Sequence, residues 1–481
     1  MNSNSLKSHA TKGILWSAVD KFAVQIGQFV VSIVLARILV PDDFGLLGML
    51  AIFIALSQTF IESGMGLGLI QRQNRTDIDF STVFVFNLAV SGLFYLLLFF
   101  SAPLIASYFN QPLLIDLTRV LGLNLFINSF AMVQRTKLTI AIDFKAIAKT
   151  NVIGVIVGGI AGVIAAMNGF GVWSLVIQTL LGSFSSTVSL WFFSHWTPSI
   201  AFSKNSFRNL FGFGSKLLLS GLYAQLLNNV YNICIGKYYP ISSLGYYSRA
   251  KGFADLSAGT ITNILHDATF PILAAVQNDK EKLVSVYSRM IRMSSFCIIP
   301  MMTLIALQAR PIVILLLTEK WVSVVPLLQW IVFSRIFLPM SAINMNLLNA
   351  MGRSDLFLKV DLSKLPLTII AMIITIPLGV KGMIIGQVVT SGVAFFINAY
   401  LPGKFYGYGA LSQLKDMLPV FIATLGMSVL VFLVIYFIDS LILQLVIGSI
   451  VAGISYLFFC WLLKLEELEE VKKMCLSLLK K

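Results

Sequence analysis

The feature that most constrains this chain is a succession of long apolar stretches along nearly all of its 481 residues. About fourteen stretches of roughly 18 to 30 residues can be distinguished, and a helix needs about 20 apolar residues to cross a bilayer. Backbone polar groups must be satisfied internally in lipid, so consecutive spans of this kind fold as helices. The expected fold class is therefore all-α, a polytopic membrane protein of about fourteen transmembrane helices.

Composition supports the same class. The chain is 57% hydrophobic and 12% charged, whereas soluble proteins carry about 25% charged residues. The connecting segments are short, so no soluble catalytic domain is expected between the spans, and the chain is not expected to be an enzyme. The expected spans are residues 13–38, 44–70, 80–108, 115–137, 147–168, 171–194, 209–238, 241–275, 291–317, 323–350, 357–379, 382–402, 417–438 and 441–463.

The connecting segments alternate in charge, which predicts the orientation of the chain. With the N-terminus inside, the inner connections hold most of the basic residues, and the outer connections hold few. We therefore expect a multi-pass protein of the cell inner (plasma) membrane with both termini cytoplasmic. The net charge of +14 follows from these loops, and no nucleic-acid partner is expected. The inner set is Arg72, Arg75, Arg135, Lys137, Lys145, Lys149, Lys204, Arg208, Lys280, Lys282, Arg289, Arg292, Arg353, Lys404 and Lys415; the outer set is Arg37, Lys237, Arg310, Lys320 and Lys381.

A weak internal repeat indicates two related halves. Parallel six-helix repeats are typical of transporters that open a central site to either side. The expected organisation is a six-helix lobe at 1–200, a second at 201–403, two accessory transmembrane helices at 404–463 and a cytoplasmic amphipathic tail at 464–481. A partner-binding role for the tail is the alternative. The repeat pairs Gln25, Gln28, Pro41 and Gly45 with Gln225, Asn228, Pro240 and Gly245.

Basic residues inside the expected spans are the candidates for substrate binding. A charge in a span is costly, so it usually faces a cavity or a partner. Cations in a cavity suit a polyanionic substrate, and a guanidinium can bind phosphate oxygens through two hydrogen bonds. The alternative is internal pairing, which we expect for Asp361 and Lys364 because they are three residues apart. The candidates are Lys21, Arg119, Lys216, Arg249, Lys251 and Arg335.

Three acidic residues in the spans are candidates for ion coupling: Glu62, Asp255 and Asp267. A buried carboxylate can carry a proton or bind Na⁺ while a transporter alternates. The competing interpretation is a structural ion pair with a lysine of the cavity. His266 beside Asp267 adds a group that titrates near neutral pH.

Other patterns have plain structural explanations. Gly154, Gly158 and Gly162 form overlapping GxxxG steps, which predict close helix packing. Asp77 and Asp79 imitate a metal-binding DxD, but they lie in a short loop without a nucleotide fold. No phosphate-binding GxxxxGK[ST] sequence occurs, and the four cysteines lack metal-ligand spacing. We expect no cofactor and no metal site.

The segment LARILVPDDFGLLGMLAIFIALSQTFIESGMGLGLIQR (35–72) resembles the N-terminal signature of Wzx-type polysaccharide flippases, of the multidrug/oligosaccharidyl-lipid/polysaccharide superfamily. SSLGYYSRAKGFADL (242–256) and GFGVWSLVIQ (169–178) are also typical of that family, and the chain looks most like its colanic-acid and exopolysaccharide branch. The resemblance implies alternating-access flipping of undecaprenyl-pyrophosphate-linked oligosaccharide repeat units for exopolysaccharide, O-antigen or capsule synthesis. It also implies contact with polysaccharide assembly proteins and with membrane lipid, and proton or Na⁺ coupling.

Four other functions remain open at this level, and one of them, a non-transporting scaffold, would leave the charges within the spans unexplained. A multidrug/cation antiporter of the same superfamily would favour an acidic cavity, whereas basic residues outnumber acidic ones in these spans. A peptidoglycan-precursor flippase would share fold and lipid anchor. A membrane-embedded glycan polymerase or ligase would usually present a large outer loop, and none is expected here.

Overall fold

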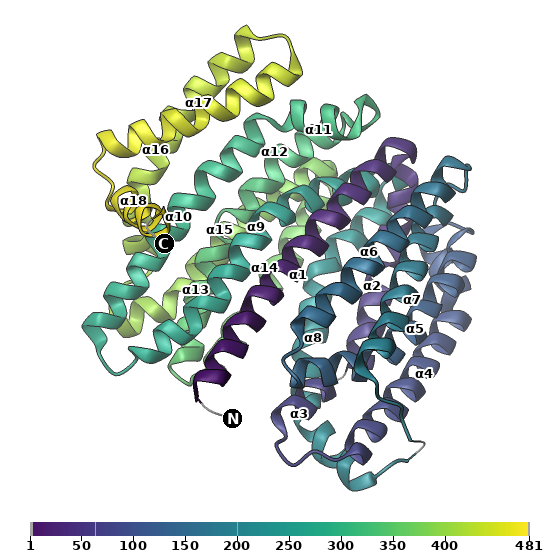
Figure 1. The fold of residues 1–481 in the computed structure, drawn as a ribbon. Helices are drawn as coiled ribbons and strands as arrows, with labels where there is room; N and C mark the ends of the chain where they lie inside the picture. Colours follow the sequence, from purple (N-terminus) through teal and green to yellow (C-terminus); the bar gives the residue numbers. More distant parts are fainter. Residues whose placement is uncertain (1–2, 63, 200, 480–481) are drawn as a thin grey trace. The chain divides into compact units, whose positions relative to one another are not determined.

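The computed structural model describes residues 3–62, 64–199 and 201–479, and these residues form helices without any β-strand. The expected all-α class is confirmed. The chain divides into two compact units, unit 1 (Met1–Gly245) and unit 2 (Tyr246–Lys481) (Figure 1). Unit 1 holds α1 (Ser3–Ile38), α2 (Pro41–Glu62), α3 (Met65–Gln71), α4 (Asp77–Phe109), α5 (Leu114–Ile140), α6 (Phe144–Met167), α7 (Trp173–Ser194), α8 (Lys204–Tyr238) and the first residues of α9 (Ile241–Ala275).

Unit 2 contains the rest of α9 and all later helices. These are α10 (Lys280–Leu307), α11 (Ala309–Leu317), the 3-10 turn η1 (Glu319–Trp321), α12 (Val324–Arg335), α13 (Leu338–Ala350), α14 (Ser354–Thr375), η2 (Ile376–Leu378), α15 (Gly379–Tyr406), α16 (Ala410–Phe437), α17 (Leu441–Leu462) and α18 (Glu466–Leu479). The expected lobe boundary at residue 200 stays a prediction.

The chain is a multi-pass membrane protein. Within the described residues, 11 stretches are long and apolar enough to cross a membrane, and one of them, Asp355–Tyr406, contains both α14 and α15. The helices α8 and α9 are each 35 residues long and are not among the 11. The expected count of fourteen spans therefore stays a prediction.

Three of the expected spans are broken within their length. The span 44–70 is interrupted at Gly64, whose positive φ of 67° suits glycine and ends the helical path. The span 291–317 changes direction at Gln308, between α10 and α11. Within the expected span 323–350, one helix ends at Arg335 and the next begins at Leu338. Apolar periodicity alone does not reveal such breaks.

Glycines allow α6 and α7 to approach each other closely, as the GxxxG steps predict. A Cβ on Gly154 would lie 2.8 Å from the carbonyl oxygen of Gly182, and one on Gly158 would lie 2.8 Å from the Cα of Gly182. Only glycine fits such backbone-to-backbone contact, which replaces hydrophobic burial as the source of helix association in lipid. This crossing fixes two walls of the cavity described below.

A second close contact joins the N-terminal turns of α2 and α9 inside unit 1. A Cβ on Gly45 would collide with the carbonyl oxygen of Ile241, and a Cβ on Gly245 would collide with the carbonyl oxygen of Pro41. Gly45 and Gly245 are equivalent positions in the internal repeat, so the two copies meet reciprocally. The repeated Pro-to-Gly segment is therefore a packing element.

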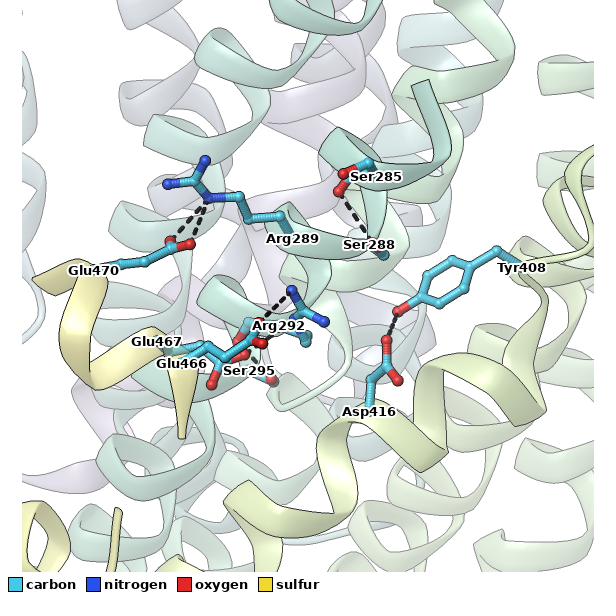
Figure 2. Close-up of polar contacts among 10 residues, drawn as sticks. All are labelled: Ser285, Ser288, Arg289, Arg292, Ser295, Tyr408, Asp416, Glu466, Glu467 and Glu470. Atoms are coloured by element: carbon cyan, nitrogen blue, oxygen red, sulfur yellow. Dashed lines mark hydrogen bonds and ion pairs between the residues drawn. The ribbon is translucent and has the colours of Figure 1, made fainter. Parts of the chain in front are cut away.

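The accessory helix α16 is joined to α10 and α13 by a buried polar network. The Gln413 side-chain nitrogen donates to the Tyr287 hydroxyl at 2.8 Å and to the side-chain oxygen Oδ1 of Asn344 at 3.0 Å. The Tyr287 hydroxyl donates to the same oxygen of Asn344. Tyr408 in turn donates to Asp416 at 2.6 Å (Figure 2). Because each group finds a partner, the network stabilises one docking position for α16.

The C-terminal helix α18 lies against α10 through ion pairs (Figures 1 and 2). Arg289 is 2.8 Å from Glu470, and Arg292 is 3.1 Å from Glu467 and 3.3 Å from Glu466. Leu465 and Leu468 at the start of this segment are buried. The amphipathic tail is thus anchored to unit 2, while its expected place at the cytoplasmic interface stays a prediction.

The reciprocal glycine contact predicts the effect of single methyl groups. Gly45→Ala and Gly245→Ala should each lower the free energy of unfolding by about 1–3 kcal/mol, because the colliding atoms are backbone carbonyls that cannot rotate away. Gly252→Ala is the control on α9, since nothing lies within 4 Å of its Cβ position. Thermal unfolding in detergent measures the effect, and equal melting temperatures for Gly45→Ala and Gly252→Ala would contradict it.

The docking of α18 predicts a change in protease sensitivity. Arg292→Glu removes both ion pairs of Arg292 and places a like charge beside the buried Glu467, so it should raise tryptic cleavage after Lys472 about fivefold by exposing α18. Arg353→Glu breaks the separate 3.0 Å pair with Asp355 and serves as the control. Mass spectrometry of the released C-terminal peptides gives the rate, and equal rates for both variants would refute this anchoring.

Candidate functional site

Unit 1 contains an open cavity made of three adjoining pockets, with volumes of about 560, 430 and 640 Å³ and a lining of both polar and apolar side chains. Asn128 lines all three pockets, and Arg135 lines two of them. The helices α1, α2, α5, α6, α7 and α8 contribute to its walls. A cavity of this size is large enough for a small organic ligand or part of a larger one.

The polar side chains of the cavity come from one face of each wall helix. On α5, Asn124, Asn128 and Arg135 are spaced by four and seven residues and so lie on one side of the helix. On α7, Thr179 and Ser183 follow the same spacing, and Ser186 continues it. These helices therefore have a polar stripe toward the cavity, although most of their remaining surface is apolar.

A hydrogen-bonded chain runs along one wall of the cavity. The Asn151 amide nitrogen donates to both carboxylate oxygens of Asp20 at 3.0 Å, and Arg135 donates to the Asn151 carbonyl oxygen at 2.9 Å. Asn151 thus links an acid on α1 to a cation on α5. The arrangement compensates two opposite charges and fixes the direction of the guanidinium group.

Glu62 lies at the mouth of the same cavity. It is the last residue of α2, it is exposed, and it lines two of the pockets. Its carboxylate accepts from Gln58 at 3.3 Å, and Gln58 accepts from Asn128 at 3.3 Å. We expected a carboxylate within a helix among small residues; the structure instead places it at a helix end, connected to the cavity by amides.

In unit 2, Arg335 and Asp255 form an ion pair beside a helix break. Arg335 Nε lies 2.7 Å from Asp255 Oδ1, and the arginine side chain is only 14% exposed. Arg335 is the last residue of α12, and Ser391 on α15 donates to the freed carbonyl of Ser334 at 2.6 Å. Lys251, one turn before Asp255 on α9, interacts electrostatically with both members of the pair. The interruption between α12 and α13 is short, and its residues Ile336 and Phe337 keep right-handed helical backbone angles.

The other expected site residues lie elsewhere. Lys21 is exposed on α1, next to Asp20. Arg119 lies toward the opposite end of α5 from Arg135, with its guanidinium 4.4 Å from the centre of the Phe99 ring, an arrangement typical of cation–π contact. Arg249 is half-buried on α9. The side chains of Lys216 and Asp267 fall outside the described residues, and the binding roles of the whole set stay predictions.

Sequence reasoning placed Arg135 among the inner connecting residues and did not select Asn128 or Asn151. The structure places all three in the cavity. The available signal was the helical spacing of Asn124, Asn128 and Arg135 within one apolar span. Ranking residues by formal charge missed this stripe, because most of its members are neutral amides.

The expected structural pair of Asp361 and Lys364 is confirmed, whereas Asp77 and Asp79, expected in a short loop, lie instead in the first turn of α4. Lys364 lies 2.5 Å from Asp361 on α14. Asp79 accepts from the Thr76 backbone N–H at 2.8 Å and pairs with Arg72 at 3.0 Å, so its carboxylate caps the start of α4. Within the described part of the chain, no group of three or more His, Cys, Asp or Glu is arranged to hold a metal ion.

Comparison with known proteins places the chain in a family. Residues 34–326 match the family described as polysaccharide biosynthesis protein. The teichuronic acid biosynthesis protein TuaB of Bacillus subtilis (strain 168) is 23% identical over 89% of this chain and 89% of its own length. The succinoglycan biosynthesis transport protein ExoT of Rhizobium meliloti (strain 1021) is 24% identical over 68% of this chain and 66% of its own length.

Among solved structures, the lipid II flippase MurJ in an inward closed conformation is similar in fold. It aligns with a TM-score of 0.79 over 93% of this chain and 98% of its own length, at 16% identity. At that identity the likeness concerns the fold. The family match covers more than half of the chain and confirms the resemblance found at residues 35–72. The chain therefore belongs to the polysaccharide biosynthesis protein family.

Proposed function

We propose that the protein flips undecaprenyl-pyrophosphate-linked oligosaccharide repeat units across the inner membrane by alternating access. The product would serve the synthesis of a surface polysaccharide. Family membership supports this function, as do a relative named as a succinoglycan transport protein and the fold shared with a lipid II flippase. The proposed substrate combines an apolar tail that stays in lipid with a charged and sugar-bearing head.

The observation that carries the proposal is the polar cavity of unit 1. A polar group without a hydrogen-bond partner in lipid costs several kcal/mol. Transmembrane helices therefore rarely line a cavity with amide side chains unless water or a polar ligand occupies that cavity. The lining provides Arg135 together with side-chain amides and hydroxyls. A hydrophilic head group requires such an environment during its passage.

We assign Arg335 to the pyrophosphate. Its side chain is mostly buried, it lies at a helix break, and one carboxylate partner leaves guanidinium N–H groups that can bind phosphate oxygens. Lys21, Arg119, Lys216, Arg249 and Lys251 are proposed to add to the positive field. Glu62, Asp255 and Asp267 are the proposed coupling acids for a proton or Na⁺.

The charge of the connecting segments supports both termini in the cytoplasm and transport from the inner to the outer leaflet. Proteins that polymerise or export the glycan are proposed partners. A multidrug/cation antiporter is less favoured, because the acid beside Arg335 is already paired with that cation. A polymerase or ligase is less favoured because the family relatives and the fold neighbour are named for biosynthesis, transport and flipping.

Deletion of the gene tests the function. Complete lipid-linked repeat units should accumulate in the inner leaflet and surface polysaccharide should be lost, because synthesis of the repeat unit precedes flipping. Leaflet assignment of extracted lipid-linked oligosaccharide, with surface polymer measured in parallel, gives the answer. Single repeat units that reach the outer leaflet but stay unpolymerised would point to an enzyme instead.

Replacing Arg335 tests its proposed role in binding the pyrophosphate. Arg335→Ala should lower surface polysaccharide roughly tenfold or more, since a hydrogen bond to a charged group contributes about 1.5–3 kcal/mol. Expression and membrane insertion should remain normal, as immunoblotting of membranes would show.

The double variant Arg335→Ala, Asp255→Ala distinguishes binding from structure. A purely structural pair predicts that removing both charges restores transport, because Asp255, whose side chain is 44% exposed, is then no longer left without its ion-pair partner. Substrate binding by Arg335 predicts that the double variant stays defective. The variant Asp361→Ala, Lys364→Ala removes the α14 pair and is the matched control with normal polymer expected.

A further inference from the structure

The ion pair of Arg335 and Asp255 joins a mostly buried cation to a more exposed acid. The Arg335 side chain is 14% exposed, whereas the Asp255 side chain is 44% exposed. Arg335 Nη1 donates to the Ser334 hydroxyl at 3.3 Å, and the hydroxyl of Ser391 on α15 donates to the Ser334 carbonyl oxygen at 2.6 Å. Arg335 is thus the fixed member of the pair, and Asp255 is the member that can turn toward water.

The pair uses only part of the guanidinium group. Asp255 Oδ1 accepts one hydrogen bond from Arg335 Nε at 2.7 Å, and the Ser334 hydroxyl accepts one from Nη1. A phosphate can bind two of the remaining N–H groups at once, which is a stronger contact than one hydrogen bond to a carboxylate. Because two anions that share one guanidinium repel each other, a bound phosphate disfavours the contact with Asp255.

Lys251 provides a second cation for the carboxylate of Asp255. It precedes Asp255 by one turn on α9, so the two side chains lie on the same face of that helix. Its charge interacts with those of both Asp255 and Arg335. A carboxylate that leaves Arg335 therefore stays beside a positive charge, which lowers the cost of the exchange.

A cation that binds phosphate also needs a counter-charge when the site is empty. An unpaired charge inside the spans is costly, and a protein that works by alternating access has to return without its substrate. Asp255 places negative charge on the same guanidinium that we assign to the pyrophosphate. The ion pair therefore suits the empty protein, and the phosphate contact suits the loaded one.

We propose that Asp255 is an internal counter-ion that competes with the pyrophosphate of the substrate for Arg335. In the empty protein the carboxylate neutralises Arg335; when the pyrophosphate binds the guanidinium, the carboxylate turns toward Lys251. The inference rests on the proposed flippase function and on the assignment of Arg335 to the pyrophosphate. It adds the regulation of that site, in which Asp255 weakens substrate binding and compensates the cation during the return of the empty protein.

Binding of undecaprenyl pyrophosphate to the purified full-length protein tests the competition. Asp255→Asn keeps the size of the side chain and removes its charge. It should lower the dissociation constant about tenfold, because a hydrogen bond between charged groups no longer has to be broken. Native mass spectrometry titration gives the constant, and Asp255→Ser repeats the measurement without an amide. Equal or weaker binding in both variants would overturn the proposal, since that is the result for a purely structural pair.

A double-mutant cycle separates this competition from a general effect of charge. Removal of any acid near the site favours an anion, but competition for Arg335 requires Arg335. In the Arg335→Gln background, Asp255→Asn should therefore change the dissociation constant by less than about twofold. A tenfold gain in that background would refute the counter-ion role. Asp361→Asn removes the acid of the α14 pair and is the matched control, with unchanged affinity expected.

The return of the empty protein gives a second readout in cells. Asp255→Asn should lower surface polysaccharide several-fold at equal abundance in the membrane, although it binds the probe more tightly, because the empty protein then holds an uncompensated guanidinium. Wild-type amounts of polymer together with tighter binding would contradict the role in the return step.

Arg335→Gln alone distinguishes failure of this inference from failure of the proposed function. If it leaves the affinity for undecaprenyl pyrophosphate unchanged, the assignment of Arg335 to the pyrophosphate is wrong. If it weakens binding while Asp255→Asn does not strengthen it, that assignment stands and the counter-ion role is wrong.

Discussion

The arrangement of the helices depends on how the protein satisfies its polar side chains within the hydrocarbon of the membrane. Hydrocarbon offers no hydrogen bonds, so each polar side chain in a span must meet another polar group or an internal hydrated space. The Gln413–Tyr287–Asn344 network satisfies this requirement by mutual pairing and fixes α16 on α10 and α13. The cavity of unit 1 satisfies it by enclosing polar side chains around free volume. The network pairs its polar groups within the protein, whereas the cavity leaves polar side chains facing free volume.

Glycine residues allow the backbones of neighbouring helices to come into direct contact. The crossing of α6 and α7 depends on Gly154, Gly158 and Gly182, where no side chain intervenes. Ser183 and Ser186 on α7 line the same cavity as Asn128 and Arg135 on α5. The reciprocal contact of Gly45 and Gly245 shows the same principle where the repeated segments meet. Close backbone packing thus determines which polar faces share a cavity.

Charge in the two units is arranged differently. Arg335 in unit 2 is mostly buried, paired with one carboxylate and placed at a helix end, so it combines charge with unused hydrogen-bond donors. Arg135 in unit 1 is instead held by a neutral amide that an acid orients. This contrast shows that an arginine in a span is informative only together with its partners.

The sequence by itself determined the all-α membrane class, the family signature at 35–72 and the pairing of Asp361 with Lys364, because apolar length and i,i+3 spacing are local properties. Only the tertiary structure decided that α12 stops at Arg335, that Asp255 is its partner, and that Arg135 and Asn151 line one cavity. Asp255 and Arg335 are 80 residues apart, and Asp20 and Asn151 are 131 apart. Such contacts follow from how helices cross, which depends on glycine steps and backbone breaks and not on the periodicity of a single helix.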